Sequence, residues 1–269
     1  MVVLSSMVIP PLGWVRRQGA MHQAFQSSGL TRDKGSPRRL RYGSGFERDA
    51  ISDVSSSRPA LAASQLACRR GDRLLFRGLD FSLQGGQIVW LRGPNGSGKT
   101  SLLRLLAGLS TPAEGSVTWD GVPLRQAGAA YHRSLCYLAH ANALKDDLTV
   151  LEALQFLARL HGQAGDAASV EPALRKVGLF SRRNAAVRTL SQGQRRRVAL
   201  ARLQVDAAAP VWILDEPYDA LDAEGTAMLD EALSQHARRG GAAVLTSHID
   251  LSLRDPQPVT LQLDAYAAR

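Results

Sequence analysis

The chain is poor in cysteine and has no long hydrophobic run. Its 269 residues include only two cysteines, Cys68 and Cys136, which are too few for a disulfide framework and match no metal-binding spacing. A reduced, cytosolic setting is therefore favoured. No segment approaches the run of about 18 uncharged apolar residues needed to cross a bilayer. We therefore expect any association with a membrane to come through a partner.

The positive charge is concentrated at one end of the sequence. The net charge is +9, and residues 1–60 carry nine Lys and Arg against four Asp and Glu. This stretch is rich in Ser, Gly, Arg and Pro and has no helical or strand period, which predicts a disordered basic extension. A start codon assigned too early and an organelle signal are the alternatives. The remaining residues, 61–269, hold less than half of the excess charge, so we expect no nucleic-acid binding by the folded part.

Strand and helix patterns alternate from about Leu61 onward. Residues 87–91 have the pattern of a buried strand, and the apolar runs 211–215 and 242–246 are typical of central parallel strands that are covered on both faces. The alternation of strands and helices predicts an α/β fold.

Two helical segments are predicted. The first follows the strand at 87–91, ends near Gly108 and has an apolar face made of Leu102, Leu103, Leu105, Leu106 and Leu109. The second is a helix-rich block from about 148 to 178, in which Thr149 and Glu152 have the spacing of a capping box.

The octapeptide GPNGSGKT fits the phosphate-binding loop of nucleotide hydrolases. Its glycines allow backbone N–H groups to face phosphates, and the helix that begins near Lys99 directs its positive end at them. Lys99 adds a mobile charge, and the Thr100 hydroxyl can ligate Mg²⁺. The loop predicts contacts with a nucleotide from Gly93, Pro94, Asn95, Gly96, Ser97, Gly98, Lys99, Thr100 and Ser101.

The segment VWILDEP places two acidic residues at the carboxyl end of a buried strand, where ligands bind in parallel α/β sheets. We expect Asp215 to hold Mg²⁺ through water. Glu216 is expected to orient and deprotonate the attacking water, which makes it the catalytic base.

The pentapeptide LSQGQ completes a pattern that resembles the nucleotide-binding subunit of ATP-binding cassette (ABC) transporters over nearly all of residues 61–269. The resemblance implies an ABC-type P-loop nucleotide hydrolase with a RecA-like parallel-sheet core, an antiparallel β subdomain and an α-helical subdomain at about 141–188. It also implies that Ser191, Gly193 and Gln194 face the γ-phosphate of ATP held by a second copy. The arginines that follow, Arg195 to Arg197, read on their own as a solvated helix face.

Two further residues match that family. Ala220-Leu221-Asp222 resembles its D-loop, which passes between subunits, so Asp222 is expected near the nucleotide. His248 follows a strand and Thr246-Ser247 and resembles the switch histidine that contacts the γ-phosphate and the attacking water. With Glu216 and Lys99 it completes the expected catalytic set.

The chain departs from the general family pattern in two places. Tyr137-Leu138-Ala139-His140 puts a histidine where a glutamine is usual, and its charge is sensitive to pH; His140 in an unrelated loop is the alternative. Residues 68–72 contain no aromatic residue to stack on adenine. Since stacking contributes about 1–3 kcal/mol per base, we expect weak nucleobase selectivity.

Several features together are similar to one subfamily, the ATP-binding subunit of the haem exporter in bacterial cytochrome c maturation. These features are His140, the segment WILDEPYDALD and the run VALARL that ends at Leu203, although Gln192 replaces the alanine of that subfamily. The resemblance implies ATP and Mg²⁺ as cofactors and a homodimer of ATPase subunits. It also implies two kinds of partner, a small transmembrane haem-exporter subunit and other cytochrome c maturation proteins. The chain is then expected at the cytoplasmic face of the bacterial inner membrane.

Other functions remain open at this stage. A cassette that powers a drug or polysaccharide exporter would share every motif above. A soluble ABC protein that acts on ribosomes or DNA would more often carry two cassettes or a long coiled-coil insertion, whereas this sequence has one phosphate loop and no such insert.

Overall fold

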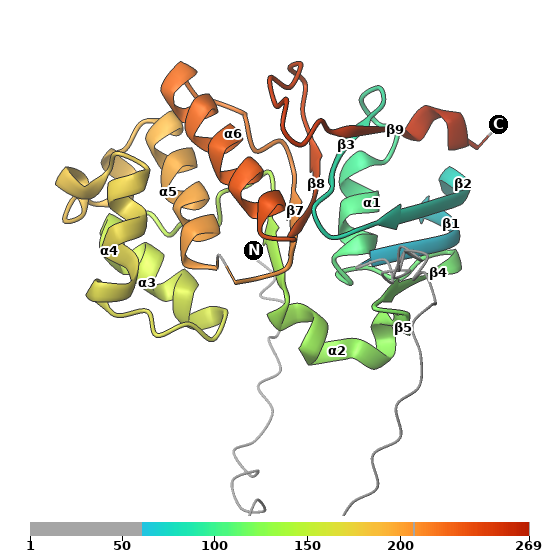
Figure 1. Cartoon of the computed structure of the whole chain (residues 1–269), viewed down its shortest axis with the longest axis horizontal. Coiled ribbons are helices and arrows are strands. Elements are labelled where there is room, and N and C mark those ends of the chain that lie inside the picture. Colours follow the sequence, from blue (N-terminus) through green and yellow to red (C-terminus); the bar gives the residue numbers. More distant parts are fainter. Residues whose placement is uncertain (1–60, 207, 269) are drawn as a thin grey trace, which may run out of the picture. The chain divides into compact units, whose positions relative to one another are not determined.

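The computed structural model describes residues 61–206 and 208–268. The extension predicted for residues 1–60 lies outside these residues. The described part contains two sheets with helices packed around them (Figure 1).

The first sheet is antiparallel and has the strand order β2-β1-β4-β5. Its members are β1 (Leu61–Arg70), β2 (Arg73–Leu83), β4 (Glu114–Trp119) and β5 (Val122–Pro123). The second sheet is parallel and has the order β6-β7-β8-β3-β9. Its members are β3 (Ile88–Arg92), β6 (Leu135–Leu138), β7 (Val211–Leu214), β8 (Ala242–Thr246) and β9 (Val259–Gln262). The predicted strands at 87–91, 211–215 and 242–246 are thus three neighbours in this sheet.

The helices fill the connections between strands. The α-helices are α1 (Lys99–Leu106), α2 (Leu124–Arg133), α3 (Val150–Leu160), α4 (Ala167–Lys176), α5 (Gln192–Val205) and α6 (Ala223–Arg238). Three short 3-10 turns are η1 (Phe180–Arg182), η2 (Val187–Thr189) and η3 (Leu263–Tyr266). Among the described residues, no helix is both long and apolar enough to cross a bilayer.

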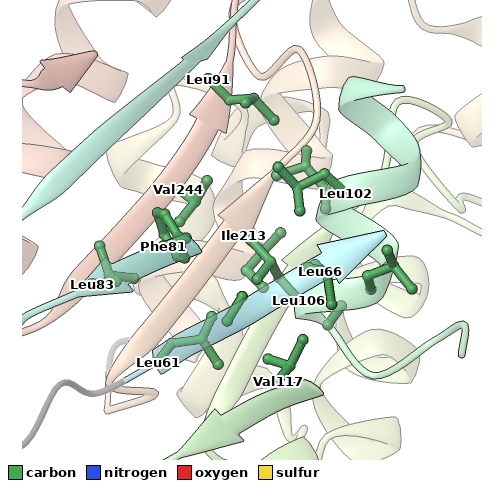
Figure 2. Close-up of a cluster of buried hydrophobic side chains, with 14 of the residues drawn as sticks. Leu61, Leu66, Phe81, Leu83, Leu91, Leu102, Leu106, Val117, Ile213 and Val244 are labelled. Carbon is green, nitrogen blue, oxygen red and sulfur yellow. The ribbon is translucent and has the colours of Figure 1, made fainter. Parts of the chain in front are cut away.

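The central strands of the parallel sheet are buried on both faces, as their continuous apolar runs predict. Successive side chains of a strand point to opposite faces. On β7, Val211 and Ile213 pack against α1 and the antiparallel sheet, while Trp212 and Leu214 pack against α5 and α6. Figure 2 shows the first of these cores, where Ile213 lies among leucines of α1 and β1. This double burial leaves the ends of the strands as the places where polar groups can gather.

A third apolar cluster holds the block that contains α3 and α4. It includes Val150, Leu154, Val170 and Leu174, and it extends to Val198 on α5. α5, which begins within the LSQGQ segment, therefore packs on this helical block with one side and on the parallel sheet with another.

The first predicted helix ends near Gly108 as expected, but Leu109 is not part of its apolar face. Gly108 adopts a left-handed conformation with φ 70°, and the N–H groups of Gly108 and Leu109 bond to the carbonyls of Leu105 and Arg104. This Schellman arrangement ends α1 at Leu106. Leu109 therefore lies beyond the helix with 54% of its surface exposed, rather than on the buried face.

Two α-helices begin with the same capping device. The Thr149 hydroxyl accepts from the Glu152 N–H at 3.2 Å, and the Glu152 carboxylate accepts from the Thr149 N–H at 2.8 Å. This capping box starts α3, as predicted. Ser191 and Gln194 form the same reciprocal pair at the start of α5.

His236 on α6 is a buried histidine in the core. Its ring stacks on Trp212 of β7 at a centroid distance of 3.9 Å, and its Nε2 lies 3.3 Å from the Ala242 carbonyl oxygen. A Cβ atom at Gly241 would lie 2.2 Å from the ring, so only glycine fits there. Burial lowers the pKa of His236 to about 4. The fold therefore favours the neutral imidazole.

This burial predicts a specific loss of stability in acid. The unfolded chain takes up a proton at His236 below pH 6.5, its ordinary pKa, but the folded chain does so only near pH 4. The free energy of unfolding should therefore fall from about pH 6.5 to pH 4 and then level off. The His236 contribution to that fall should be about 2 kcal/mol between pH 7 and pH 5. Urea unfolding of the wild type and of His236→Phe, which keeps a ring beside Trp212, would measure it as the difference between the two pH curves. Parallel curves would contradict the assignment.

Candidate functional site

The phosphate-binding loop connects β3 to α1, as the sequence predicts. β3 ends at Arg92 and α1 begins at Lys99, so the N–H groups of the first helical turn lie at the end of the loop. Gly98 has φ 103°, and a Cβ there would come within 3.2–3.3 Å of Leu75 and Phe76. The Lys99 ammonium donates to the carbonyl of Gly93 at 2.8 Å. Backbone conformation and close packing thus explain the glycine immediately before the lysine.

Two buried acids follow β7 and are held by a threonine at the end of β8. The Thr246 hydroxyl donates to the Asp215 carboxylate at 2.9 Å and accepts from the Glu216 N–H at 2.7 Å. Thr246 is fully buried, and Asp215 and Glu216 are almost so. One hydroxyl therefore fixes the positions of both acidic residues relative to the neighbouring strand.

Glu216 has an unusual backbone conformation beside a histidine. Its φ is 49°, in the left-handed region that non-glycine residues seldom occupy. Its carboxylate oxygen lies 3.4 Å from Nε2 of His248. Burial raises the pKa of Glu216, and the charges of Asp219 and Asp215 raise it further, while His248 and Lys99 oppose the shift. A carboxylate with a raised pKa is a better proton acceptor than an exposed one.

A pocket of about 440 Å³ brings most of the predicted site residues together. Its lining includes residues from the phosphate loop, from the ends of β6, β7 and β8, and from the β1–β2 hairpin. These residues are Arg70, Arg73, Leu75, Asn95, Gly96, Gly98, Lys99, Thr100, Ser101, His140, Asp215, Glu216 and His248. Gly93, Pro94 and Ser97 belong to the same loop but do not line the pocket.

Two oxygen-bearing side chains in this pocket suit a magnesium ion. Thr100 offers a hydroxyl and Asp215 a carboxylate, and Mg²⁺ prefers oxygen ligands and keeps several of its waters. The residues present therefore fit the expected metal together with phosphate oxygens of a nucleotide.

The hairpin side of the pocket has two arginines and a leucine in place of an aromatic ring. Arg70, Arg73 and Leu75 lie there, and no lining residue contributed by the hairpin is Phe, Tyr or Trp. The arrangement agrees with the absence of a stacking aromatic in residues 68–72. Weak nucleobase selectivity stays a prediction.

The predicted residues of LSQGQ, which is called the signature segment below, lie outside this pocket together with Asp222. Ser191, Gly193, Gln194 and Asp222 do not line it. The Ser191 hydroxyl and the Gln194 side chain are engaged in the capping box, and the Asp222 carboxylate caps α6 by accepting from the Gly225 N–H. This separation is what a second copy of the chain would require if it supplied these groups to another nucleotide.

A second pocket of about 520 Å³ borders α5, the helix that begins within the signature segment and is called the signature helix below. It is lined by His140, Asn142, Gln192, Arg195, Arg196, Asp219 and Ala220. The His140 imidazole lies 3.5 Å from the Asp219 carboxylate. His140 therefore borders both pockets, at the loop where the family pattern places a glutamine.

The arginines after the signature segment are not a solvated helix face, contrary to the prediction. Arg196 is only 2% exposed and bonds to main-chain carbonyls of two site loops. Arg195 pairs with Asp146 at 2.8 Å, and Arg197 bonds to Asp222. A helix that packs on both the helical block and the sheet buries more of its circumference than the polar pattern of its sequence indicates. In the sequence, nothing in the run of three arginines distinguishes the buried Arg196 from its two neighbours.

Sequence reasoning also missed Thr246, Asn142 and Asp219. Thr246 could have been noticed because it is a polar residue that ends an apolar strand next to His248. The other two lie in loops whose conformation no local pattern specifies.

Comparisons with known proteins give one consistent family match. A family model described as ABC transporter matches residues 76–219. The cytochrome c biogenesis ATP-binding export protein CcmA of Aromatoleum aromaticum is 46% identical over 79% of this chain and 99% of that protein. The protein of the same name from Methylococcus capsulatus is 47% identical over 72% and 93%, respectively.

Solved structures show the same fold. A putative ABC transporter ATP-binding protein from Pyrococcus furiosus aligns with a TM-score of 0.67 at 24% identity, over 77% of this chain and 99% of that one. A bacterial ABC transporter cassette solved as a dimer aligns with a TM-score of 0.65 at 21% identity, over 76% and 94%.

The Thr246 bridge predicts a separable effect of its hydroxyl. Thr246→Val has nearly the same shape but leaves the buried Glu216 N–H without an acceptor, so the free energy of unfolding should fall by about 1–3 kcal/mol. Nucleotide hydrolysis should fall by about tenfold or more, the equivalent of roughly 1.4 kcal/mol in the barrier, because both acids lose their common anchor. Urea unfolding and steady-state turnover would measure these changes. Thr246→Ser keeps the hydroxyl and is the control; equal losses in both variants would contradict the role of the bridge.

Proposed function

Since the chain belongs to the ABC transporter family, and within it to the cytochrome c biogenesis ATP-binding export proteins, we propose that it is the ATP-hydrolysing subunit of a haem exporter. The observation that carries this proposal is the 46% identity that extends over 99% of the Aromatoleum aromaticum protein. His140 at the glutamine position supports it, because the same departure marks the subfamily that the sequence resembles.

We propose these roles for the residues of the first pocket. Lys99 and the N–H groups at the start of α1 bind the phosphates, and Thr100 and Asp215 hold Mg²⁺, which would neutralise charge on the phosphate oxygens. Glu216 orients the attacking water and accepts its proton, and its raised pKa suits that task. His248 contacts Glu216 and lines the same pocket, and we propose that it contacts the γ-phosphate and the attacking water.

Two copies of the chain would complete each site. Ser191, Gly193 and Gln194 of one copy would face the nucleotide held by the other copy, with the positive end of α5 directed at its γ-phosphate. Asp222 would lie at the same interface. The position of these residues outside the first pocket supports this arrangement, because they cannot serve the nucleotide of their own subunit there.

The complex would sit at the cytoplasmic face of the bacterial inner membrane. The chain would bind there through a small transmembrane subunit and act with other cytochrome c maturation proteins. We expect haem to be handled by these partners.

Removing the base should separate nucleotide binding from hydrolysis. Glu216→Gln keeps the shape of the side chain but cannot accept the proton, so turnover should fall by about 10²-fold or more while ATP binding is retained. In the presence of ATP the dimer of this variant should then accumulate, and size-exclusion chromatography would detect it. Glu231→Gln makes the same substitution on the exposed surface of α6 and should behave as the wild type. Near-normal hydrolysis by Glu216→Gln would refute the assignment of the base.

The biological role can be tested in cells that produce this protein. Loss of its gene should abolish haem-stained c-type cytochromes, and a wild-type copy should restore them, whereas Glu216→Gln should not. The tagged wild-type chain should also co-purify from membranes with a small multi-spanning protein. Normal c-type cytochromes in the deletion strain would contradict haem export and leave another ABC exporter as the function.

A further inference from the structure

Arg196, in the second turn of α5, connects two loops of the hydrolytic site to the signature helix. Its guanidinium is buried to 2% exposure and lies within hydrogen-bonding distance of six oxygen acceptors. Five of the six are main-chain carbonyls. Arg196 therefore holds mainly the backbone of these loops rather than their side chains.

Three of these carbonyls belong to the loop that carries the catalytic base. Nη2 donates to the carbonyls of Asp215, at 3.0 Å, and of Glu216, and Nε donates to the carbonyl of Pro217 at 3.3 Å. The peptide groups on both sides of Glu216 are thus fixed: its own carbonyl and that of Asp215 bond to Arg196, and its N–H bonds to Thr246.

The remaining acceptors belong to the loop after β6. Nη1 lies 3.3 Å from the carbonyls of Ala139 and His140 and 2.9 Å from the side-chain oxygen of Asn142. A second contact joins the same two loops, because the His140 imidazole lies 3.5 Å from the Asp219 carboxylate. The loop of His140 and the loop of Glu216 are therefore linked both through Arg196 and directly.

A guanidinium suits this position, and a lysine does not. Arginine presents five N–H donors in a rigid plane, so it can bond to two loops at once, whereas the ammonium of lysine is a compact point charge with three donors. Burial lowers the pKa of Arg196, and the charges of Asp219, Asp215 and Glu216 oppose that shift. The side chain stays charged, since even a lowered arginine pKa is far above neutrality.

The backbone of Glu216 explains why such a set of bonds is needed. A left-handed conformation in a non-glycine residue costs about 1–3 kcal/mol and persists only where its surroundings enforce it. The bonds from Arg196 to the two carbonyls that flank Glu216 hold this conformation. If they were lost, the peptide could relax and move the carboxylate away from His248.

We propose that Arg196 is a positioning residue for ATP hydrolysis, which holds Glu216 and the His140 loop in a fixed arrangement relative to the signature helix. The inference rests on the ATPase activity of the family and not on which molecule the complex exports. Arg196 does not line the phosphate pocket, so it acts through Glu216 and not on the nucleotide itself.

The test is the separation of turnover from binding in Arg196→Lys. In the full-length protein, kcat for ATP hydrolysis should fall by about 10²-fold. KM and the ATP dissociation constant should stay within about threefold of the wild type, because the phosphate loop is untouched. Arg196→Gln carries no buried charge and should show the same separation, so it replaces the lysine variant if that variant does not fold.

Arg202→Lys is the matched control. Arg202 is also a buried arginine of α5, but it bonds to Asp206 at 3.1 Å and to the Tyr137 carbonyl at 3.1 Å, away from Glu216. The melting temperatures of the two lysine variants should fall by similar amounts, whereas kcat of Arg202→Lys should stay within about threefold of the wild type. A purely structural role for Arg196 predicts equal loss of kcat in both.

A second measurement asks whether Arg196 acts through Glu216. Single-turnover hydrolysis by Glu216→Gln and by Glu216→Gln/Arg196→Lys should be equally slow, because the positioned base is already absent. Effects that multiply in the double variant, or kcat in Arg196→Lys within threefold of the wild type, would overturn the inference. Failure of the proposed export function would appear differently. The purified wild-type protein would show normal ATPase kinetics, but the c-type cytochromes of the cell would not depend on it.

Discussion

The double burial of the parallel sheet is the constraint on which the site depends. With apolar side chains packed on both faces of β3, β7 and β8, the chain can place polar groups only where these strands end. The strand order β6-β7-β8-β3 then sets the loops that follow these four strands side by side. Lys99, Glu216, His248 and His140 come from distant parts of the sequence and line one pocket for this reason.

Within that edge, the backbone from Glu216 to Ala220 is constrained at several points. Both residues are left-handed, with φ of 49° and 61°, and the Asp219 N–H bonds back to the Glu216 carbonyl at 3.1 Å. Buried backbone groups need partners, and here Thr246 supplies the acceptor and Arg196 the donors. The position of Glu216 is therefore set by residues on β8 and α5 as much as by its own strand.

The sequence predicted the parts of this structure that depend on local pattern. Apolar runs located the central strands, the spacing of Thr149 and Glu152 located a helix start, and the phosphate-loop glycines located the connection from β3 to α1. It failed where tertiary packing decides. Leu109 fits a helical face by spacing but follows a left-handed Gly108, and Arg196 looks solvated by polarity but is buried between α5 and two loops. A residue whose partners are carbonyls far along the chain leaves no periodic signal, because any residue can supply a carbonyl.

The departure of the signature segment from the family pattern has a structural reason. A Cβ at Gly193 would lie 2.7 Å from the Ala220 carbonyl oxygen, so the start of α5 and the left-handed turn at Ala220 approach too closely for any side chain there. Gln192 instead lines the open second pocket, where a long side chain has room. Of the two glycine positions in the family pattern, packing leaves only that of Gln192 free for a side chain, and the substitution falls there.

The close approach at Gly193 also means that the start of α5 and the turn before Asp222 cannot shift independently. A displacement of α5 in the proposed dimer would therefore reach Glu216 by two routes, through the Ala220 turn and through Arg196.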